Sequence, residues 1–347
     1  MLAWASATND VGGIQGRQNR ALVRLLYHDD GSNSATAARN TKRLIQEGVQ
    51  ILLGPYSSEL MIAAVSVAAQ RGRLIWNHGG ASDGVHRLGA HIVGILTSAS
   101  RYFTEFPSLA LRINPQGRSL VCFYHAGSNF GRKVVQGALV AARQLGMGAT
   151  TRTYRSSEAI PRLIQELKEV DFVLSAGSFQ DDVCLAHELL QRRLPIVACG
   201  LVAAGMTEFR YALGDGHEGF LAPSQWEPSV RPQVDFGPQS SEVAARIAAQ
   251  GVAVDYPAAQ AYAACLLAQH CLEQTEDWDD SNVWRTAWQL DCTTFFGRFK
   301  IDPSNGLQTG HHMVWLQWQK GEKAIVWPTE YAGANPLPFR QVGEEID

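Results

Sequence analysis

Short apolar runs alternate with longer amphipathic segments along most of the chain. Residues 49–53 form one such run and are followed by a segment of helical composition at 58–70, and residues 120–124 are followed in the same way by 131–145. Continuous apolar strands separated by helices are typical of βαβ units, in which helices cover both faces of a parallel sheet. The pattern therefore predicts an α/β protein with doubly wound parallel sheets.

The alternation runs through the chain twice. Before a turn at 114–117 we expect strands at 22–27, 49–53 and 74–76, and helices at 36–47, 58–70 and 100–113. After it we expect strands at 120–124, 150–154, 172–174, 196–199 and 219–222, and helices at 131–145, 159–168 and 182–192. A proline-rich stretch at 223–238 precedes three further helices, at 241–250, 257–273 and 283–289. Residues 296–301 and 313–319 are predicted to form a β-hairpin with a wide loop.

The predicted elements form two successive halves, and later segments of the chain return to each half. This arrangement predicts a two-lobed protein. At about 100–200 residues per domain, a chain of 347 residues is long enough for two cores. We expect lobe 1 to contain residues 1–115 and 226–293, lobe 2 to contain 116–225 and 294–330, and 331–347 to form a loose C-terminal tail. Such lobes bind ligands in the cleft between the carboxyl ends of their strands.

Composition excludes several classes of protein. The chain has 33 acidic and 30 basic residues, a net charge of −3, which argues against nucleic acid as a partner. No apolar run approaches the ~18–20 residues that span a bilayer. Six cysteines are too few for a disulfide scaffold, and the absence of a CxxC pair argues against zinc. We expect buried free thiols, with Cys122 and Cys199 in strands, and leave one structural disulfide open as the alternative.

Catalytic and metal-binding motifs are absent from the sequence. There is no GxSxG, GxxxxGK[ST], GxGxxG or HExxH segment, so we expect neither an enzyme nor a cofactor. His311 and His312 are neighbours that point to opposite faces of a strand, and we expect ordinary exposed histidines rather than a metal site. Asp29-Asp30 and Asp181-Asp182 precede helices, where capping accounts for the acidic pairs.

Two loops that follow strands of the first half are the candidate binding segments. Tyr56, Ser57 and Ser58 join a strand to a helix start, where N–H groups and hydroxyls can bind a carboxylate. The alternative is that Ser57 or Ser58 is only an N-cap. The next strand is followed by a second loop, with Gly79, Gly80, Ala81 and Ser82, and paired glycines allow a ligand to approach the backbone closely. Neighbouring βα units place these loops side by side. In the second half, 128–131 and 177–179 hold the equivalent positions.

The order and spacing of several motifs resemble a known family. The segments are Asn9-Asp10-x-Gly12-Gly13-Ile14-x-Gly16-Arg17, then Asp29-Asp30, Gly54-Pro55-x-Ser57-Ser58, Phe130-Gly131, Phe296-Gly297-Arg298-Phe299-x-Ile301-Asp302, Asn305-Gly306 and Gln317-Trp318-Gln319-Lys320-Gly321. Together they resemble the type I periplasmic binding proteins, and among these the branched-chain amino acid (Leu/Ile/Val) binding proteins of ABC importers. The resemblance extends over residues 1–328.

The resemblance implies a function and residue roles. The expected function is capture of a small amino acid, amide or carboxylate between two hinged lobes and delivery to an ABC transporter permease, in the periplasm or outside the cell. A ligand-sensing regulatory protein of the same fold is the alternative. Ser57 matches a serine that binds the ligand carboxylate, Gly79 and Ala81 or Ser82 complete that pocket, and Phe130 matches an aromatic that closes over the ligand. Ser178 or Phe179 stands where another aromatic often lies.

The sequence departs from the family pattern at two places. Relatives that bind α-amino acids usually hold the ammonium with an acid at the position of Val202, so either another acid such as Asp83 substitutes or the ligand has no ammonium. Relatives also begin with a strand and a helix before the Asn-Asp-x-Gly-Gly turn, and only the end of that helix is present. We interpret this as a mis-assigned or trimmed start that lacks the first strand of lobe 1 and a signal peptide, with a genuinely degenerate form as the alternative.

Overall fold

A computed structural model describes residues 1–347 with the exception of 18, 89–90 and 340–347. The chain divides into two compact units: unit 1 contains Met1–Ser98 and Gln225–His312, and unit 2 contains Ala99–Ser224 and Met313–Asp347. This division differs from the predicted lobes at two segments. Residues 99–115 belong to unit 2, because Phe106 packs on the ring of Trp315. Residues 294–312 belong to unit 1, because Phe295 packs on Tyr262.

Unit 1 is built around a small parallel sheet, in the order β3-β4-β5. Its helices are α1 (Leu2–Asp10), α2 (Ser34–Gln46), α3 (Ser58–Ala69), α9 (Ser240–Ala248), α10 (Tyr256–Gln274), α11 (Asp280–Gln289) and the 3₁₀ turn η1 (Asp83–Leu88). Its strands are β1 (Ile14–Gln15), β2 (Arg20–Ala21), β3 (Leu52–Leu53), β4 (Ile75–Asn77), β5 (Ile92–Gly94), β11 (Cys292–Thr294) and β12 (Gly297–Phe299).

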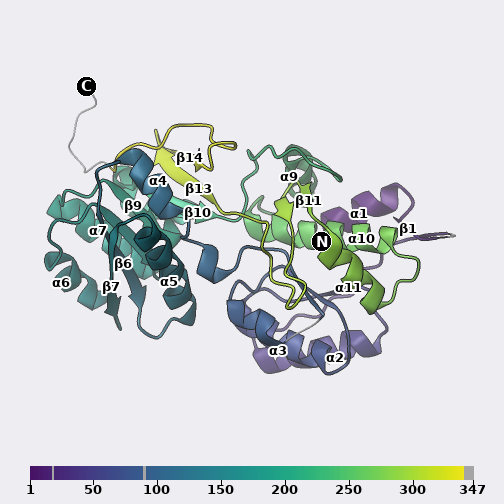
Figure 1. The fold of residues 1–347 in the computed structure, drawn as a ribbon. Helices are drawn as coiled ribbons and strands as arrows, with labels where there is room; N and C mark the ends of the chain where they lie inside the picture. The colour runs from purple at the N-terminus through teal and green to yellow at the C-terminus, as the bar shows by residue number, and fades with distance from the viewer. Residues whose placement is uncertain (18, 89–90, 340–347) are drawn as a thin grey trace. The chain divides into compact units, whose positions relative to one another are not determined.

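Helices cover both faces of the unit 1 sheet (Figure 1). On one face Trp76 and Val93 pack with α1 and with α10, most of whose residues are buried. On the other face Leu52, Ile75 and Ile92 pack on α3, with residues of α2 beside them. Side chains of successive strand residues point to opposite faces, so a strand covered on both faces must be apolar throughout. This is why the short apolar runs identified β3 and β4, whereas β5 was not predicted.

One predicted strand is absent. Residues 22–27 are extended, and their side chains alternate between half-buried and exposed, with Val23 and Leu25 turned toward the core. The segment nevertheless joins no sheet within the described residues. Its apolar sequence was correctly identified, but no strand among the described residues pairs with it.

Unit 2 contains a seven-stranded sheet in the order β14-β13-β10-β9-β8-β6-β7. Its strands are β6 (Ser119–His125), β7 (Gly148–Tyr154), β8 (Phe172–Ala176), β9 (Ala198–Leu201), β10 (Leu221–Ser224), β13 (Val314–Gln319) and β14 (Glu322–Trp327). Its helices are α4 (Phe106–Ile113), α5 (Asn129–Gln144), α6 (Ile160–Gln165), α7 (Phe179–Arg192) and α8 (Thr207–Leu213), with 3₁₀ turns η2 (Ala99–Arg101), η3 (Ser157–Ala159), η4 (Val202–Gly205) and η5 (Gly214–His217). Strands β6 to β10 are parallel, and β13 and β14 are antiparallel additions at one edge.

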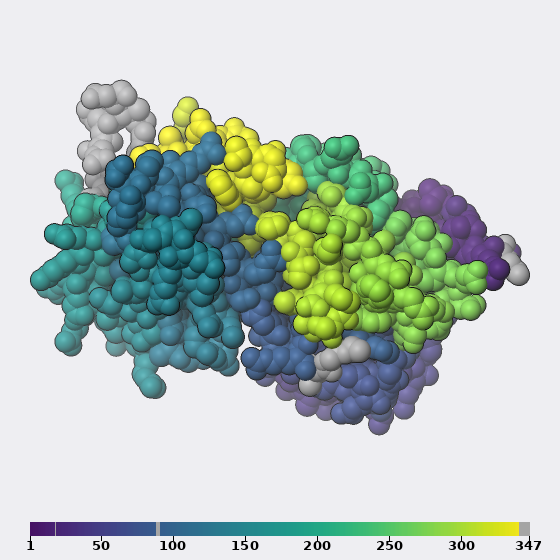
Figure 2. Space-filling model, in the orientation of Figure 1, coloured from purple at the N-terminus to yellow at the C-terminus, as the bar shows by residue number. Residues whose placement is uncertain are grey.

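The C-terminal part corrects two predictions. No hairpin joins 296–301 to 313–319: β12 pairs with β11, and β13 pairs with β10 and β14. The described part of the tail, 331–339, packs on unit 2, where Phe339 is buried and lies 4.7 Å from the ring of Phe220. In Figure 2 the yellow C-terminal segment covers part of unit 2 beside the blue residues of α4, and Arg112 donates a hydrogen bond to Thr329 there.

Candidate ligand-binding loops

The two candidate loops of unit 1 lie side by side, as expected. The Ser57 N–H donates to the carbonyl oxygen of Gly79 at 3.2 Å, and the Ser82 N–H donates to Ser58 Oγ at 2.9 Å. A Cβ at Gly79 would stand 2.6 Å from the Cα of Tyr56, so the approach of the two backbones requires glycine there. The structure therefore brings Tyr56, Ser57 and Ser58 together with Gly79 and the residues that follow it.

Asn77, the last residue of β4, organises the second loop. Its side chain is fully buried; Oδ1 accepts the N–H groups of Gly79 (3.3 Å) and Gly80 (2.8 Å), and Nδ2 donates to the Gly80 carbonyl at 2.9 Å. Sequence reasoning did not single out Asn77. Its signal was an amide residue at the end of a strand, two positions before a glycine pair, since Asn side chains commonly bond the backbone of turns. Ala81 and Ser82, which follow, are half-buried.

Ser57 combines a helix cap with a strained backbone. Its Oγ accepts the Leu60 N–H at 3.4 Å as the N-cap of α3, and its backbone has φ 107° and ψ 150°, a region that is essentially restricted to glycine. Ser57 therefore does cap α3, as the alternative interpretation expected. Within the described residues the cap leaves the N–H groups of Ser58 and Glu59 without a partner at the positive end of the helix dipole.

His78 is a second unexpected feature of these loops. The side chain is 6% exposed, and neither ring nitrogen has a hydrogen-bond partner within the described residues. Burial lowers the pKa of His78 to about 4, because the charged ring cannot be solvated there. The imidazole is therefore neutral at pH 7 and offers one donor and one acceptor.

The candidate residues of unit 2 follow three adjacent parallel strands. Ser128 and Phe130 follow β6, Ser178 and Phe179 follow β8, and Val202 follows β9. Both serines are N-caps: Ser128 Oγ accepts the Gly131 N–H at 2.9 Å, and Ser178 forms a capping box with Asp181. The carboxyl ends of neighbouring parallel strands share one sheet edge, so these loops lie together.

The two aromatic candidates differ in their surroundings. Phe130 is half-buried, and its ring packs edge-on against Tyr102 with the centroids 5.4 Å apart. Phe179 begins α7 and is also half-buried. Val202 begins η4 and is half-buried as well. Three partly accessible apolar side chains therefore follow three adjacent strands.

The Asp182 side chain links the loops after β8 and β9 through hydrogen bonds. The carboxylate is fully buried; Oδ1 accepts Ser175 Oγ (2.6 Å) and the Gly177 N–H (3.1 Å), and Oδ2 accepts the Ala203 N–H (3.0 Å). Burial is the largest influence on its pKa and raises it to about 7, although these hydrogen bonds favour the charged form. We expected only helix capping from Asp181-Asp182. Asp181 does cap α7, whereas Asp182 ties the β8 and β9 loops together.

Metal and thiol chemistry receive no support from the described residues. They contain no group of three His, Cys, Asp or Glu side chains arranged to hold a metal ion, and all six cysteines are free thiols. Cys122 and Cys199 are buried in strands as expected, and burial raises the pKa of both thiols. The expectation of an exposed His311 was wrong. It is 2% exposed and bonds to Thr97 Oγ1 (2.6 Å) and the Phe296 carbonyl (2.9 Å).

The comparison with known families decides what kind of fold this is. A family model described as periplasmic binding protein matches residues 1–323. The chain belongs to this family. The predicted resemblance and the α/β fold with parallel sheets are thereby confirmed, and the family supports a ligand-binding role. None of the helices that the structure describes is both long and apolar enough to cross a membrane.

Solved structures of other periplasmic binding proteins share the fold. The leucine-binding protein LivK from Thermotoga maritima has a TM-score of 0.75 at 14% identity, over 93% of this chain and 91% of that one. A substrate-binding protein of an ABC transporter from Desulfitobacterium hafniense, in complex with Leu, has a TM-score of 0.75 at 18% identity, over 93% of both chains. A solute-binding protein from Rhodopseudomonas palustris, in complex with p-hydroxybenzoic acid, has a TM-score of 0.71 at 14% identity, over 93% and 89%.

Proposed function

We propose that the protein is a non-enzymatic solute-binding protein whose ligand is a small carboxylate that lacks an ammonium group. The observation that carries this proposal is the pair of unit 1 loops, in which strain and uncapped N–H groups occur together. Ser57 holds a backbone conformation that costs on the order of 1–3 kcal/mol, and such strain is retained mainly at functional sites. The neighbouring Ser58 and Glu59 N–H groups are suited to an anionic oxygen.

The unit 2 loops favour a ligand without an ammonium. An α-ammonium that leaves water needs a carboxylate partner, and the position after β9 holds Val202. The two acids beside the β8 loop are engaged within the protein, since Asp181 accepts Ser178 Oγ at 2.8 Å and Asp182 bonds inward. Phe130 and Phe179 offer aromatic surface. The solved relative that carries p-hydroxybenzoic acid contains a ligand of this kind, a carboxylate with an aromatic ring and no ammonium.

Two further parts of the proposal rest on the similar proteins. Solved structures with this fold include substrate- and solute-binding proteins of ABC transporters, so we propose delivery of the ligand to a permease and a periplasmic or extracellular location. A regulatory role for the same ligand site is the alternative. The two differ in the partner: the first requires a transporter that takes up the ligand, and the second a protein whose activity responds to it.

Thermal-shift titration with matched ligands tests the ligand class. Benzoate and 4-hydroxybenzoate are compared with benzamide, benzylamine and leucine. A ligand at 100 times its dissociation constant stabilises by about 2.7 kcal/mol, a shift of roughly 5–10 °C for a unit of this size. We expect the carboxylates to give this shift and benzylamine to give none. Stabilisation by leucine and not by benzoate would show that the ligand carries an ammonium, and stabilisation by no carboxylate, amide or amino acid would refute the binding role.

A charge introduced at Val202 provides the matched variant. Val202→Glu supplies the missing carboxylate, so we expect weaker benzoate binding and a gain in leucine binding. Val140→Glu is the control, because Val140 is half-exposed on the outer side of α5, away from the loops. Equal effects of the two substitutions would mean that position 202 does not face the ligand.

A further inference from the structure

A chain of hydrogen bonds within unit 1 connects the loop after β4 to a distant turn at residues 302–306. The His86 ring, in η1, lies between the two. Its Nδ1 is 3.1 Å from the carbonyl oxygen of Asn305, and its Nε2 is 3.2 Å from the side-chain nitrogen of Asn77. Asn77 is fully buried and His86 is 8% exposed. Both contacts are therefore shielded from water, and each needs one donor and one acceptor.

The backbone around Asn77 determines which ring nitrogen of His86 carries the proton. The Asn77 side-chain oxygen accepts the N–H groups of Gly79 and Gly80, so the amide is oriented with its nitrogen toward His86. An amide nitrogen only donates, and His86 Nε2 must therefore be an acceptor without a proton. The Asn305 carbonyl only accepts, so Nδ1 must carry the proton. The neutral ring with the proton on Nδ1 is the form that satisfies both contacts.

The ring is held in place by the backbone of β5. A Cβ at Gly94 would stand 2.8 Å from His86 Cε1 and 3.0 Å from the carbonyl oxygen of Gly306. The Gly94 N–H donates to that carbonyl at 2.9 Å, so the turn at 302–306 is bonded to the same strand. The ring thus lies against β5 between two fixed partners, and a rotation of the ring would break both of its hydrogen bonds.

The charges around the ring do not compensate for its burial. Burial has the largest influence on the pKa of His86 and lowers it below the usual 6.5, whereas the Asn305 carbonyl and the Asp83 carboxylate act in the opposite direction. Strands β4 and β5 consist of uncharged residues, and α3 contributes apolar side chains to the core that it shares with η1. In the turn, Asp302 accepts the Ser304 hydroxyl at 2.6 Å.

We propose that neutral His86 positions the ligand loop and that a proton taken from solvent on its Nε2 releases the ligand. With Nε2 protonated, two N–H donors face each other, and the Asn77 amide has to rotate. The rotation removes the acceptor of the Gly79 and Gly80 N–H groups. It also displaces the Gly79 carbonyl, which accepts the Ser57 N–H at 3.2 Å. This inference rests on the proposed function, which assigns the ligand to these two loops.

NMR spectroscopy of the ligand-free protein tests the positioning role. Long-range ¹H–¹⁵N spectra distinguish a protonated from an unprotonated ring nitrogen, and comparison with His86→Gln assigns the ring among the ten histidines. At about pH 8 we expect the proton on Nδ1. Once the ring is protonated, we expect the protection of the Gly80 amide against exchange to fall by about tenfold or more.

Calorimetric titration with benzoate tests the release. Between about pH 8 and pH 5 benzoate stays ionised, and the dissociation constant should rise by up to about tenfold per pH unit below the pKa of His86. His86→Gln places an amide oxygen near the position of Nε2 and takes up no proton. We expect it to bind within about threefold of the unmodified protein at pH 8 and to lose this rise. His86→Leu removes the acceptor and should weaken binding about tenfold across the range.

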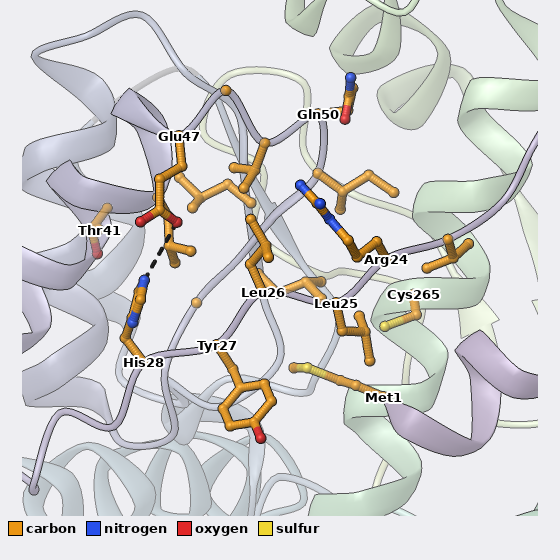
Figure 3. Close-up of a pocket in the computed structure, with 18 of the residues that line it drawn as sticks. Met1, Arg24, Leu25, Leu26, Tyr27, His28, Thr41, Glu47, Gln50 and Cys265 are labelled. Atoms are coloured by element: carbon orange, nitrogen blue, oxygen red, sulfur yellow. Dashed lines mark hydrogen bonds and ion pairs between the residues drawn. The ribbon is translucent and has the colours of Figure 1, made fainter.

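His28 provides a matched control in the same unit. Figure 3 shows its ring directed at Glu47 in a pocket beside β3, with Nε2 3.5 Å from the Glu47 carboxylate. A carboxylate accepts a hydrogen bond from the neutral and from the charged ring, so a proton breaks no contact there. His28→Gln should therefore leave the pH dependence of benzoate binding unchanged.

Three results would overturn the proposal. The first is a neutral His86 ring with its proton on Nε2, and the second is the same pH dependence in His86→Gln as in the unmodified protein. The third is loss of the pH dependence in His28→Gln, which would place the proton elsewhere. If no carboxylate binds at pH 8, the proposed function fails together with the release step, whereas the NMR measurements still confirm or refute the positioning role of His86.

Discussion

The strain at Ser57 leads to a prediction about stability that runs against the usual effect of glycine. Ser57→Ala and Ser57→Gly both remove the hydroxyl that caps α3, so both lose the hydrogen bond to Leu60, which at 3.4 Å is long. Loss of such a cap costs about 0.5–1 kcal/mol. The two variants then differ only in the Cβ, and the Cβ is what makes φ 107° and ψ 150° unfavourable.

The magnitude follows from opposing contributions. Glycine relieves strain of about 1–3 kcal/mol in this region of backbone space. It also costs about 0.5–1 kcal/mol, because the unfolded chain gains freedom. The middle of these ranges makes Ser57→Gly more stable than Ser57→Ala by about 1 kcal/mol. Elsewhere in a protein, where φ is negative, the glycine variant is the less stable of the two.

Urea unfolding of the two variants side by side measures this difference. Ser156 provides the control, because it also caps a helical turn and has φ −150°, an ordinary extended value. At Ser156 the glycine variant should be no more stable than the alanine variant. If Ser57→Ala proves as stable as Ser57→Gly, the backbone at 57 is not strained and the argument for a functional loop loses its main support. Both variants should also bind benzoate more weakly than the unmodified protein.

Three further predictions concern buried ionisable groups and the aromatic candidate. Burial raises the pKa of Asp182 from 3.8 to about 7 in the folded state, so its contribution to stability is fully present below pH 3.8 and is lost as the pH rises to about 7. The melting temperature should therefore decline over this range, and Asp182→Asn should remove the decline. The folded pKa of His78 is lowered to about 4 from 6.5, so stability rises between these values, and His78→Gln should flatten that rise in the same melting series. Phe130→Ala should weaken benzoate binding by roughly tenfold or more in calorimetry and leave the melting temperature nearly unchanged, unlike a substitution that disrupts the core; undiminished binding would remove Phe130 from the site.

The strands buried on both faces were predictable because their signal is local. Residues 172–174 and 74–76 are apolar whichever way they point, so an apolar run identifies them without knowledge of their neighbours. The predicted hairpin was wrong for the opposite reason. The segment that ends at Ile301 and the strand that begins at Val314 both look like strands, but the sequence between them does not show that each pairs with a different partner.

The predicted adjacency of the two unit 1 loops agrees with the structure, whereas the residues that organise the loops were missed. Glycines and serines after strands are visible in the sequence, and the structure does bring Ser57 and Gly79 into contact. The roles of Asn77 and Asp182 depend on which backbone groups of other loops come within reach, and that is a property of the tertiary structure. His311 shows the same limit, since the hydroxyl of Thr97 that bonds it lies 214 positions earlier in the chain.

Each unit is formed from distant parts of the chain, and this affects the order in which the two units can fold during synthesis. Trp4 of α1 donates to Gln269 of α10, and the core of unit 1 needs both helices. At ~5–20 residues per second, a ribosome that has made α1 requires on the order of 10–50 s to reach α10. Strands β6 to β10 of unit 2 come from one continuous segment, 119–224, and do not wait in this way. The unit that is begun second can thus complete its parallel sheet first, while the apolar residues of the first unit still lack their partner.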